Sequence, residues 1–246
     1  DRNPKYIKLV DKYEVKQIVS DIIGEEYVVP TLGVYNNFDE IDFDTLPECF
    51  VMKCTHDSGS TILCRDKKNF DQRKAKKNLN KYLKRNFFYC GREWPYKNVH
   101  PRIIIESLLK DEKQKDILDY KFLCFNGKVR LCFVCSDRYS SGGLKVDFYD
   151  LNWKHMPFER HYKNSDRKIK KPKKFQEMIR LAERLAENIP FVRIDFFEVN
   201  GQIYFGEYTF YPGCGLEGFT PEKWDGILGE WINLSDGDKN ENTNSR

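Results

Sequence analysis

The stretch that most constrains this chain covers residues 191–209, FVRIDFFEVNGQIYFGEYT. Two runs rich in Val, Ile, Phe and Tyr flank Asn200 and Gly201, which tolerate positive φ, so the stretch predicts a β-hairpin. Arg193 and Asp195 stand two residues apart on the first strand and therefore share one face. Carboxylates scarcely occur in strands this apolar unless they bind something, so we interpret this hairpin as part of a ligand site.

The second strand carries another acid, Glu207. A plain two-residue turn would place Val199 opposite Gln202, and Asp195 and Glu207 would then point to opposite faces. If the two carboxylates share a metal, the hairpin needs an odd count, from either a three-residue loop with Gly201 left-handed or a β-bulge, and we predict that odd count. Two acids and an arginine on one face would suit a magnesium ion and an anionic phosphate. The alternative is that both acids are solvent-facing strand residues.

Length and composition allow several classes of protein and argue against others. A chain of 246 residues permits one large domain or two small ones. The net charge of +4 is mild, which permits an anionic substrate but is not typical of a dedicated nucleic-acid binder. There is no apolar run of membrane-span length and no visible signal peptide, so we expect a cytoplasmic protein with reduced cysteines. The chain begins at Asp1 without a methionine, so we expect its N-terminal segment to be truncated.

A second informative unit is a strand, a loop of small residues and a return strand within residues 49–65. Lys53 stands near the end of the first strand, and Ser58, Gly59 and Ser60 follow in the loop. Small residues let backbone N–H groups approach phosphate oxygens, and the lysine supplies a point charge. It is not a Walker A loop, because no GK[ST] helix follows. The alternative is an ordinary hairpin whose lysine side chain extends to solvent.

Hydrophobic periodicity predicts the remaining elements. Helices are expected at 11–23, 69–86 and 175–188 and from Thr220, and further strands at 102–106, 119–125, 128–135 and 146–150. Asn69 is the expected cap of the second helix, whose basic face we interpret as solvated. Asp119 and Lys121 share a face of their strand.

The order of these motifs resembles the ATP-grasp superfamily, and within it the TupA-like branch, named for teichuronopeptide synthesis. The resemblance spans residues 11–234 and is carried by DKYEVK, FVMKCTHDSGS, RIIIESLL, DYKFLCFNGK, FVRIDFFEVNGQIYFGEYTFYPG and FTPEKWDGILGEWINL. It implies an α+β ATP-grasp fold, in which two α+β subdomains clamp ATP between antiparallel sheets. The expected parts are an N-terminal helical and connector segment (1–48), a small subdomain with the loop and hinge (49–109), a large subdomain with the metal site (110–234) and a disordered tail (235–246).

The same resemblance implies which residues bind ATP. They would be Lys53, His56, Ser58, Gly59, Ser60, Glu106, Ser107, Leu108, Leu109 and Asp119. Lys53 and the loop would hold the phosphates, while Glu106 and the backbone of 107–109 would hold the adenine at the hinge. Asp119 would lie near the ribose.

The resemblance also implies a catalytic group and a metal site. Arg193 would stabilise the transferring phosphoryl group, and Lys121 and Arg138 would address phosphates or the developing acyl phosphate. The magnesium ligands would be Asp195, Glu207 and Thr209. Many ATP-grasp ligases have E-x-N on the last strand, whereas this chain has threonine at the third position, and a hydroxyl is the weaker magnesium ligand. One or two metals therefore stay open.

The implied activity is ATP-dependent ligation of a carboxylate to an amine through an acyl phosphate, giving an amide, ADP and phosphate. The substrates would be small or sugar-linked building blocks of a bacterial cell-envelope polysaccharide or teichuronopeptide, with an anionic acceptor. One alternative is a phosphotransferase acting on a hydroxyl, with His56 or Asp57 as general base. The others are a metal-dependent glycosyltransferase that uses a nucleotide-sugar and a binding module without turnover.

Overall fold

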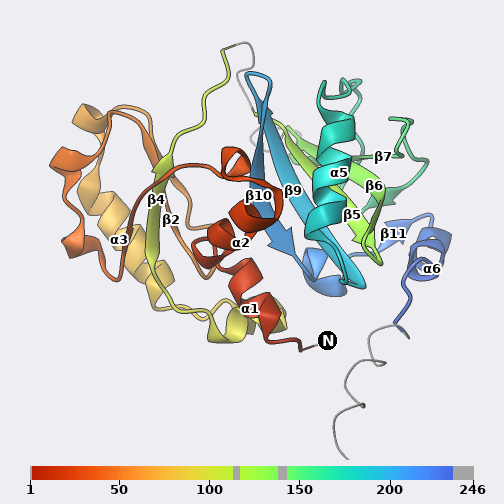
Figure 1. The fold of residues 1–246 in the computed structure, drawn as a ribbon, viewed down its shortest axis with the longest axis horizontal. Helices are drawn as coiled ribbons and strands as arrows, with labels where there is room; N and C mark the ends of the chain where they lie inside the picture. The colour runs from red at the N-terminus through yellow and green to blue at the C-terminus, as the bar shows by residue number, and fades with distance from the viewer. Residues whose placement is uncertain (1, 113–116, 138–142, 235–246) are drawn as a thin grey trace, which may run out of the picture. The chain divides into compact units, whose positions relative to one another are not determined.

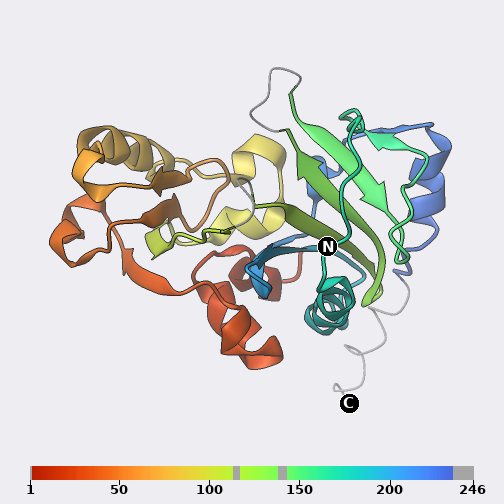
Figure 2. The ribbon, with the colours of Figure 1, turned by 90° about the horizontal axis from the view of Figure 1, so that it is seen from above.

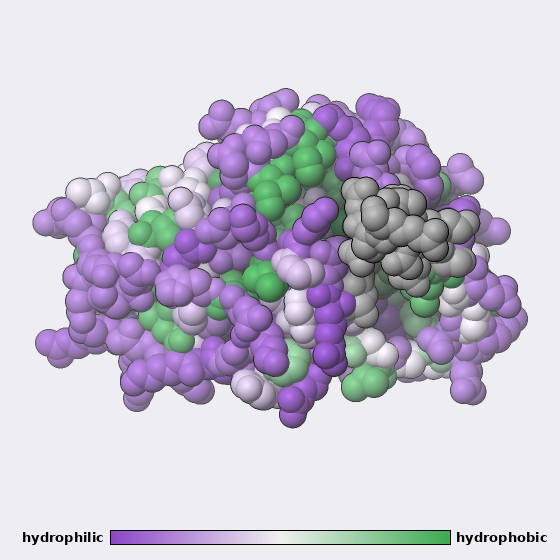
Figure 3. All heavy atoms as spheres, turned by 60° about the horizontal axis from the view of Figure 1, so that its bottom comes forward, coloured by the Kyte–Doolittle hydropathy of each residue, from purple (hydrophilic) through white to green (hydrophobic). Residues whose placement is uncertain are grey.

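The computed structural model describes residues 2–112, 117–137 and 143–234. The chain divides into two compact units, Asp1–Lys115 and Asp116–Arg246, which are traced in Figure 1. The predicted catalytic Arg138 and the expected tail of residues 235–246 lie outside the described residues. Most of the surface visible in Figure 3 is hydrophilic, as expected when charged residues make up 33% of the chain. No helix in the described ranges is long and apolar enough to cross a membrane.

Among its described residues, the first unit has a four-stranded antiparallel sheet in the order β1-β4-β2-β3. Its strands are β1 (Thr31–Tyr35), β2 (Phe50–Cys54), β3 (Ile62–Cys64) and β4 (Ile103–Ser107). Its helices are α1 (Lys5–Val10), α2 (Glu14–Ile23), α3 (Gln72–Leu83) and α4 (Phe88–Gly91), with short 3-10 helices at Glu25–Tyr27, Phe38–Glu40, Phe43–Thr45, Lys67–Asn69 and Trp94–Asn98. Ala75 and Leu79, one turn apart on α3, join the core formed by the sheet.

The start of α3 differs from the prediction. The helix begins at Gln72 and is capped by Asp71, whose side chain accepts from the backbone N–H of Lys74 at 2.9 Å. The expected cap, Asn69, instead ends a 3-10 helix. The reason is Phe70, which stands in extended conformation with its ring 5.4 Å from the ring of Phe50 in the core. Burial of that ring separates the 3-10 helix from α3.

In the described part of the second unit, five antiparallel strands form a sheet in the order β10-β9-β5-β6-β7. They are β5 (Asp119–Phe125), β6 (Lys128–Ser136), β7 (Lys145–Tyr149), β9 (Phe191–Val199) and β10 (Gln202–Thr209). Helix α5 (Phe175–Leu185) packs on one face, where the rings of Phe175 and Phe122 lie 5.7 Å apart. Figure 2 shows this unit from above.

The opposite face of the same sheet carries a second apolar cluster. The pair β8 (Glu159–Arg160) and β11 (Phe219–Thr220) and helix α6 (Lys223–Gly229) belong to this side, and the 3-10 helix η6 (Pro212–Gly215) precedes β11 in the chain. Phe133, Phe148 and Phe158 form its centre together with Leu228 of α6. The last helix was expected from Thr220, but that residue belongs to β11 and pairs with Glu159.

The β9–β10 hairpin has the predicted odd count. Asn200 and Gly201 form the turn with φ of 51° and 80°, and the register runs without interruption from Val199↔Gln202 to Phe196↔Phe205. It then shifts by one residue, because Tyr208 pairs with Ile194. Two residues of β10 at this point, Gly206 and Glu207, therefore face one residue of β9, Asp195, which is a β-bulge.

Gly206 lies at a close approach of the two strands in the bulge. A Cβ on this residue would lie 3.2 Å from both the Cβ and the carbonyl oxygen of Asp195. The bulge reverses the alternation of β10, so that Glu207 turns to the face that carries Arg193 and Asp195.

Candidate active site

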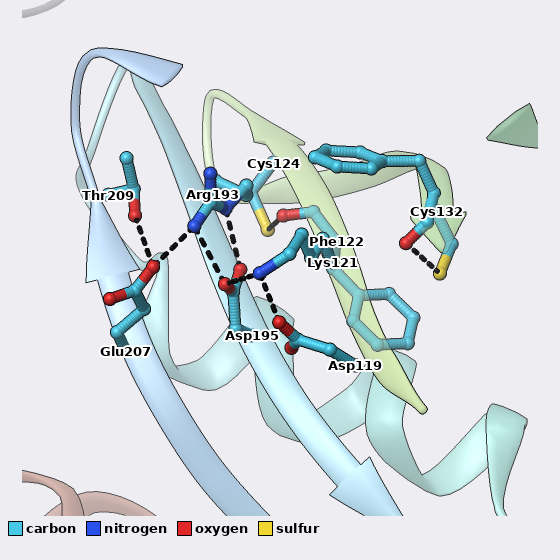
Figure 4. A network of polar contacts seen from close by, with 10 residues as sticks. Asp119, Lys121, Phe122, Cys124, Cys132, Arg193, Asp195, Glu207 and Thr209 are labelled. Carbon is cyan, nitrogen blue, oxygen red and sulfur yellow. Dashed lines mark hydrogen bonds and ion pairs between the residues drawn. The ribbon is translucent and has the colours of Figure 1, made fainter. Parts of the chain in front are cut away.

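Polar side chains from three neighbouring strands meet on one face of the second unit's sheet (Figure 4). They are Asp119 and Lys121 of β5, Arg193 and Asp195 of β9, and Glu207 and Thr209 of β10. The register places Lys121 directly opposite Asp195, so the two side chains leave the sheet side by side. The structure thus brings together all the residues predicted for the metal site and, among described residues, all those predicted for catalysis.

Arg193 is the centre of this network. Its Nε donates to Asp195 Oδ1 and its Nη2 to Asp195 Oδ2, each at 2.7 Å, which is bidentate guanidinium–carboxylate geometry. The same Nη2 donates to Glu207 Oε1 at 2.5 Å, and Thr209 Oγ1 donates to that oxygen at 3.3 Å. The arginine therefore holds the acids of both hairpin strands.

Lys121 completes the network from β5. Its ammonium donates to Asp195 Oδ2 and lies 2.5 Å from Asp119 Oδ2. Its side chain is 7% exposed and that of Asp195 is 1% exposed, whereas the side chain of Glu207 is 38% exposed. Asp195 thus lies at the base of the cluster, and Glu207 is the most exposed of the three carboxylates, since the side chain of Asp119 is 22% exposed.

Burial and charge have opposing effects on these groups. Burial raises the pKa of Asp195 to about 6, even though Arg193 and Lys121 act to lower it. Burial acts to lower the pKa of the Arg193 guanidinium, but Asp195 and Glu207 outweigh it and raise that pKa above its ordinary value. Lys121 behaves in the same way, since burial is outweighed by its carboxylate neighbours. At neutral pH both cations are charged and Asp195 is mostly ionised.

The charge balance suits a hard cation. In the described network three carboxylates face two cations, which leaves one negative charge in excess. Carboxylate and hydroxyl oxygens are the ligands that magnesium prefers. Within the described ranges no three His, Cys, Asp or Glu side chains are grouped as a metal cluster, and Lys121 and Arg193 contact the acids directly. The residues that could supply oxygen ligands here are Asp195, Glu207 and Thr209, the set predicted for magnesium.

In the first unit, two lysines converge on one buried acid. Glu106 of β4 is 5% exposed; its Oε1 lies 2.5 Å from Lys16 Nζ and its Oε2 lies 2.5 Å from Lys53 Nζ. Burial alone would raise the pKa of Glu106, but the two lysines outweigh it and lower that pKa. The predicted Lys53 and Glu106 are thus in direct contact. Lys16, which the sequence analysis did not single out, holds the other carboxylate oxygen.

The loop between β2 and β3 is held in place from several sides. Ser60 Oγ donates to Asp57 Oδ1 at 2.6 Å and accepts from the backbone N–H of Cys54 at 2.8 Å. Lys12 donates to the carbonyl oxygen of Asp57, and Arg85 Nη2 donates to that of Ser58 at 2.9 Å. The predicted loop residues therefore sit in a preorganised backbone that Lys12 and Arg85 support.

Gly59 and His56 occupy different parts of this loop. Gly59 is exposed with φ of 93°, a conformation that glycine adopts readily. His56 is 2% exposed, and its Nε2 lies 3.2 Å from the carbonyl oxygen of Tyr82 and 3.0 Å from that of Arg85. Burial lowers the pKa of His56. The ring is therefore a neutral donor to these carbonyls, beneath the loop rather than on its open side.

The predicted hinge follows β4. Ser107 is the last residue of that strand, and its N–H donates to the carbonyl oxygen of Pro30 at 3.0 Å. Leu108 and Leu109 come next and are half-buried. Sequence reasoning missed Lys12, Lys16 and Arg85. The two lysines stand four residues apart within the motif DKYEVK, which was the local signal that could have found them.

These features define an α+β protein of the ATP-grasp class, as predicted. The chain belongs to the TupA-like ATPgrasp family, whose model matches residues 1–233. This match confirms the resemblance found from the motifs.

Comparison with solved structures gives the same fold. The chain is similar to D-alanine–D-alanine ligase from Bacillus anthracis, with 16% identity and a TM-score of 0.50 over 90% of this chain and 62% of that one. It is also similar to the ATP-grasp ligase PsnB in complex with a minimal precursor, with 10% identity and a TM-score of 0.46 over 85% of this chain and 54% of that one. The chain thus spans less than two thirds of each of these structures. A comparison with curated protein sequences gave no match.

Proposed function

We propose that this protein is an ATP-dependent ligase that joins a carboxylate to an amine. The observation that carries the proposal is the charged network in which Arg193 and Asp195 are buried and Glu207, turned to the same face by the bulge in β10, joins them beside Lys121. Phosphoryl transfer needs positioning and charge neutralisation rather than covalent chemistry by the protein. A preorganised set of two cations and an excess of carboxylates answers that need.

Each group of residues has a role in this proposal. Lys53 and the backbone N–H groups of the loop residues Ser58, Gly59 and Ser60 bind the phosphates of ATP. Glu106 and the backbone of residues 107–109 hold the adenine, and Asp119 lies near the ribose. Two observations support these assignments. Arg85 holds the backbone of the β2–β3 loop, and Lys16 and Lys53 both pair with the carboxylate of Glu106.

The metal and the reacting groups would lie on the second unit. Asp195, Glu207 and Thr209 hold magnesium, which when bound neutralises phosphate charge. Arg193 and Lys121 stabilise the phosphoryl group as it passes to the substrate carboxylate, and the amine then displaces phosphate from the acyl phosphate. Arg138, outside the described residues, keeps its predicted role on the phosphates. The substrates we propose are small or sugar-linked precursors of a bacterial envelope polysaccharide or teichuronopeptide, joined in the cytoplasm.

The competing phosphotransferase would need a general base near the transferred group. Both candidates are buried, because His56 is 2% and Asp57 0% exposed. His56 faces backbone carbonyls, and Asp57 accepts from Ser60. This placement argues against His56 and Asp57 as the general base of a phosphotransferase.

The test is ATP turnover with paired acids and amines. Purified protein is incubated with magnesium, ATP and a panel of uronic acids and amino acids, and release of ADP and phosphate is measured. Hydroxylamine added in place of the amine should trap the acyl phosphate as a hydroxamate. Glu207→Gln should abolish both signals, and Glu183→Gln, on α5 at the opposite face of the sheet, should keep them. Phosphorylated alcohol without hydroxamate would identify a phosphotransferase instead.

A further inference from the structure

A second arginine lies buried near the charged network. Arg160 of β8 is 9% exposed, and Glu217 is the carboxylate paired with it among the described residues. Arg160 Nε and Glu217 Oε2 are 3.0 Å apart, but both atoms are buried without a well-oriented hydrogen bond. The pair is therefore held together by charge, and the N–H donors of the Arg160 guanidinium lack well-oriented acceptors among the described residues.

The register of the sheet shows where this arginine lies. A row of directly paired residues crosses four strands: Asp195, Lys121, Phe133 and Phe148. The guanidinium carbon of Arg160 lies 4.7 Å from the ring centroid of Phe133 and 5.6 Å from that of Phe148. The guanidinium carbon of Arg193 lies 5.9 Å from the same Phe133 ring. The two arginines thus flank one phenyl ring on the face that carries the candidate site.

Both members of the pair are held by the backbone. Arg160 pairs with Phe219 across β8 and β11. Glu217 packs against Gly213, where a Cβ would lie 2.3 Å from the carboxyl carbon. Gly213 has φ of 61° and lies in η6, four residues after Thr209, the last residue of β10. The segment that follows the predicted metal ligand therefore places Glu217 against Arg160.

The two arginines differ in how far carboxylates satisfy them. Arg193 makes hydrogen bonds to two carboxylates, and these raise its pKa. Arg160 has one misaligned carboxylate, and burial lowers its pKa despite that partner. A buried cation with an incomplete set of acceptors is unfavourable in a folded protein unless a ligand completes the set.

We propose that Arg160 binds a carboxylate group of the substrate beside the phosphoryl site, with Glu217 as the residue that neutralises and positions it between turnovers. This inference deepens the proposed function and rests on it. The guanidinium fork can bind a carboxylate bidentately, and cation–π contacts with the rings of Phe133 and Phe148 hold the guanidinium at this position. The substrate class would be acids that offer this site a free carboxylate, such as uronic acids or amino acids.

Arginine side-chain NMR tests this site without turnover. Protein labelled with ¹⁵N at arginine Nε is compared with Arg160→Lys, which identifies the Arg160 signal by its absence. Two acids are titrated at constant ionic strength, each with a neutral counterpart: D-glucuronate with D-glucose, and L-alanine with L-alaninamide. The signal of Arg167, whose side chain is 64% exposed, reports non-specific anion binding.

We expect a saturable shift of the Arg160 signal with at least one acid, none with its neutral counterpart, and no saturable shift of Arg167. An Arg160 signal that neither acid moves, or that the neutral counterpart moves equally, overturns the proposal. Glu217→Gln removes the competing carboxylate and should tighten binding of that acid by at least about threefold. Unchanged or weaker binding would contradict the role of Glu217, and Glu222→Gln is the matched exposed control.

The failure of this inference and that of the proposed function can be told apart. The titration requires neither ATP nor magnesium, so it reports on Arg160 even if no ligase activity is found. Conversely, absence of magnesium-dependent ATP binding would refute the proposed function, and the NMR titration would still show whether Arg160 binds a carboxylate.

Discussion

Replacing Arg193 should destabilise the protein far more than replacing its partner Asp195. The described network contains three carboxylates and two cations: Asp119, Asp195, Glu207, Lys121 and Arg193. Arg193→Gln leaves one cation among three acids and removes the ionic bonds to Asp195 and Glu207. Removal of one partner of a buried ion pair costs about 3–5 kcal/mol. Asp195→Asn leaves two charges of each sign. It should lower the free energy of unfolding by only about 1–2 kcal/mol, because one carboxylate acceptor of the network is lost.

Urea unfolding followed by tryptophan fluorescence measures this asymmetry, since Trp153, Trp224 and Trp231 belong to the second unit. We expect the free energy of unfolding to fall by at least about 2 kcal/mol more for Arg193→Gln than for Asp195→Asn. Arg167→Gln, which breaks an exposed ion pair with Asp137, should change it by less than about 1 kcal/mol. Equal costs, or a larger cost for Asp195→Asn, would refute the charge balance that we assign to the site.

Three further predictions concern single residues. Gly206→Ala places a Cβ 3.1 Å from the ring of Phe197 and should lower the free energy of unfolding, measured with urea, by about 1–3 kcal/mol. The control is Gly226→Ala on α6, where a Cβ meets no neighbour and should raise the same free energy by about 0.5–1 kcal/mol. Burial lowers the pKa of His56 from 6.5, so the stability that the neutral ring contributes is present above pH 6.5 and is lost as pH falls through the folded-state pKa. When the free energy of unfolding is measured with urea from pH 7.5 to 4.5, it should depend less on pH in His56→Gln than in the unmodified chain. Lys53→Met should weaken magnesium–ATP binding by about tenfold or more in calorimetry, and the exposed Lys76→Met should leave it unchanged; equal affinities would contradict the phosphate role of Lys53.

The hairpin was predictable because strand parity is a strict rule. Asp195 and Glu207 can share a face only if one residue is inserted, and the structure places that insertion at Gly206 and Glu207. The face shared by Asp119 and Lys121 followed from the same alternation. Local periodicity thus carried the prediction of the three strands that hold the charged network.

Other parts of the site depend on contacts distant in sequence. Lys16 meets Glu106 only after α2 and β4 pack in one unit, and Arg160 lies in a two-residue strand that has no periodic signal. His56 was expected on the open side of the loop because it precedes the run of Ser58, Gly59 and Ser60, but its ring contacts the carbonyl groups at the end of α3. Tertiary packing decided these three positions, which no local pattern encodes.

Thermal stability with nucleotides tests the central claim most directly. The chain and its Asp195→Asn/Glu207→Gln double variant are heated with magnesium and ATP, with ATP and EDTA, or with UDP-glucuronate. A site saturated to 100 times its Kd stabilises the fold by about 2.7 kcal/mol. We predict that ATP raises Tm only with magnesium and only in the unmodified chain. No rise with magnesium–ATP, or a rise with UDP-glucuronate alone, would contradict the assignment of this site to ATP-dependent ligation.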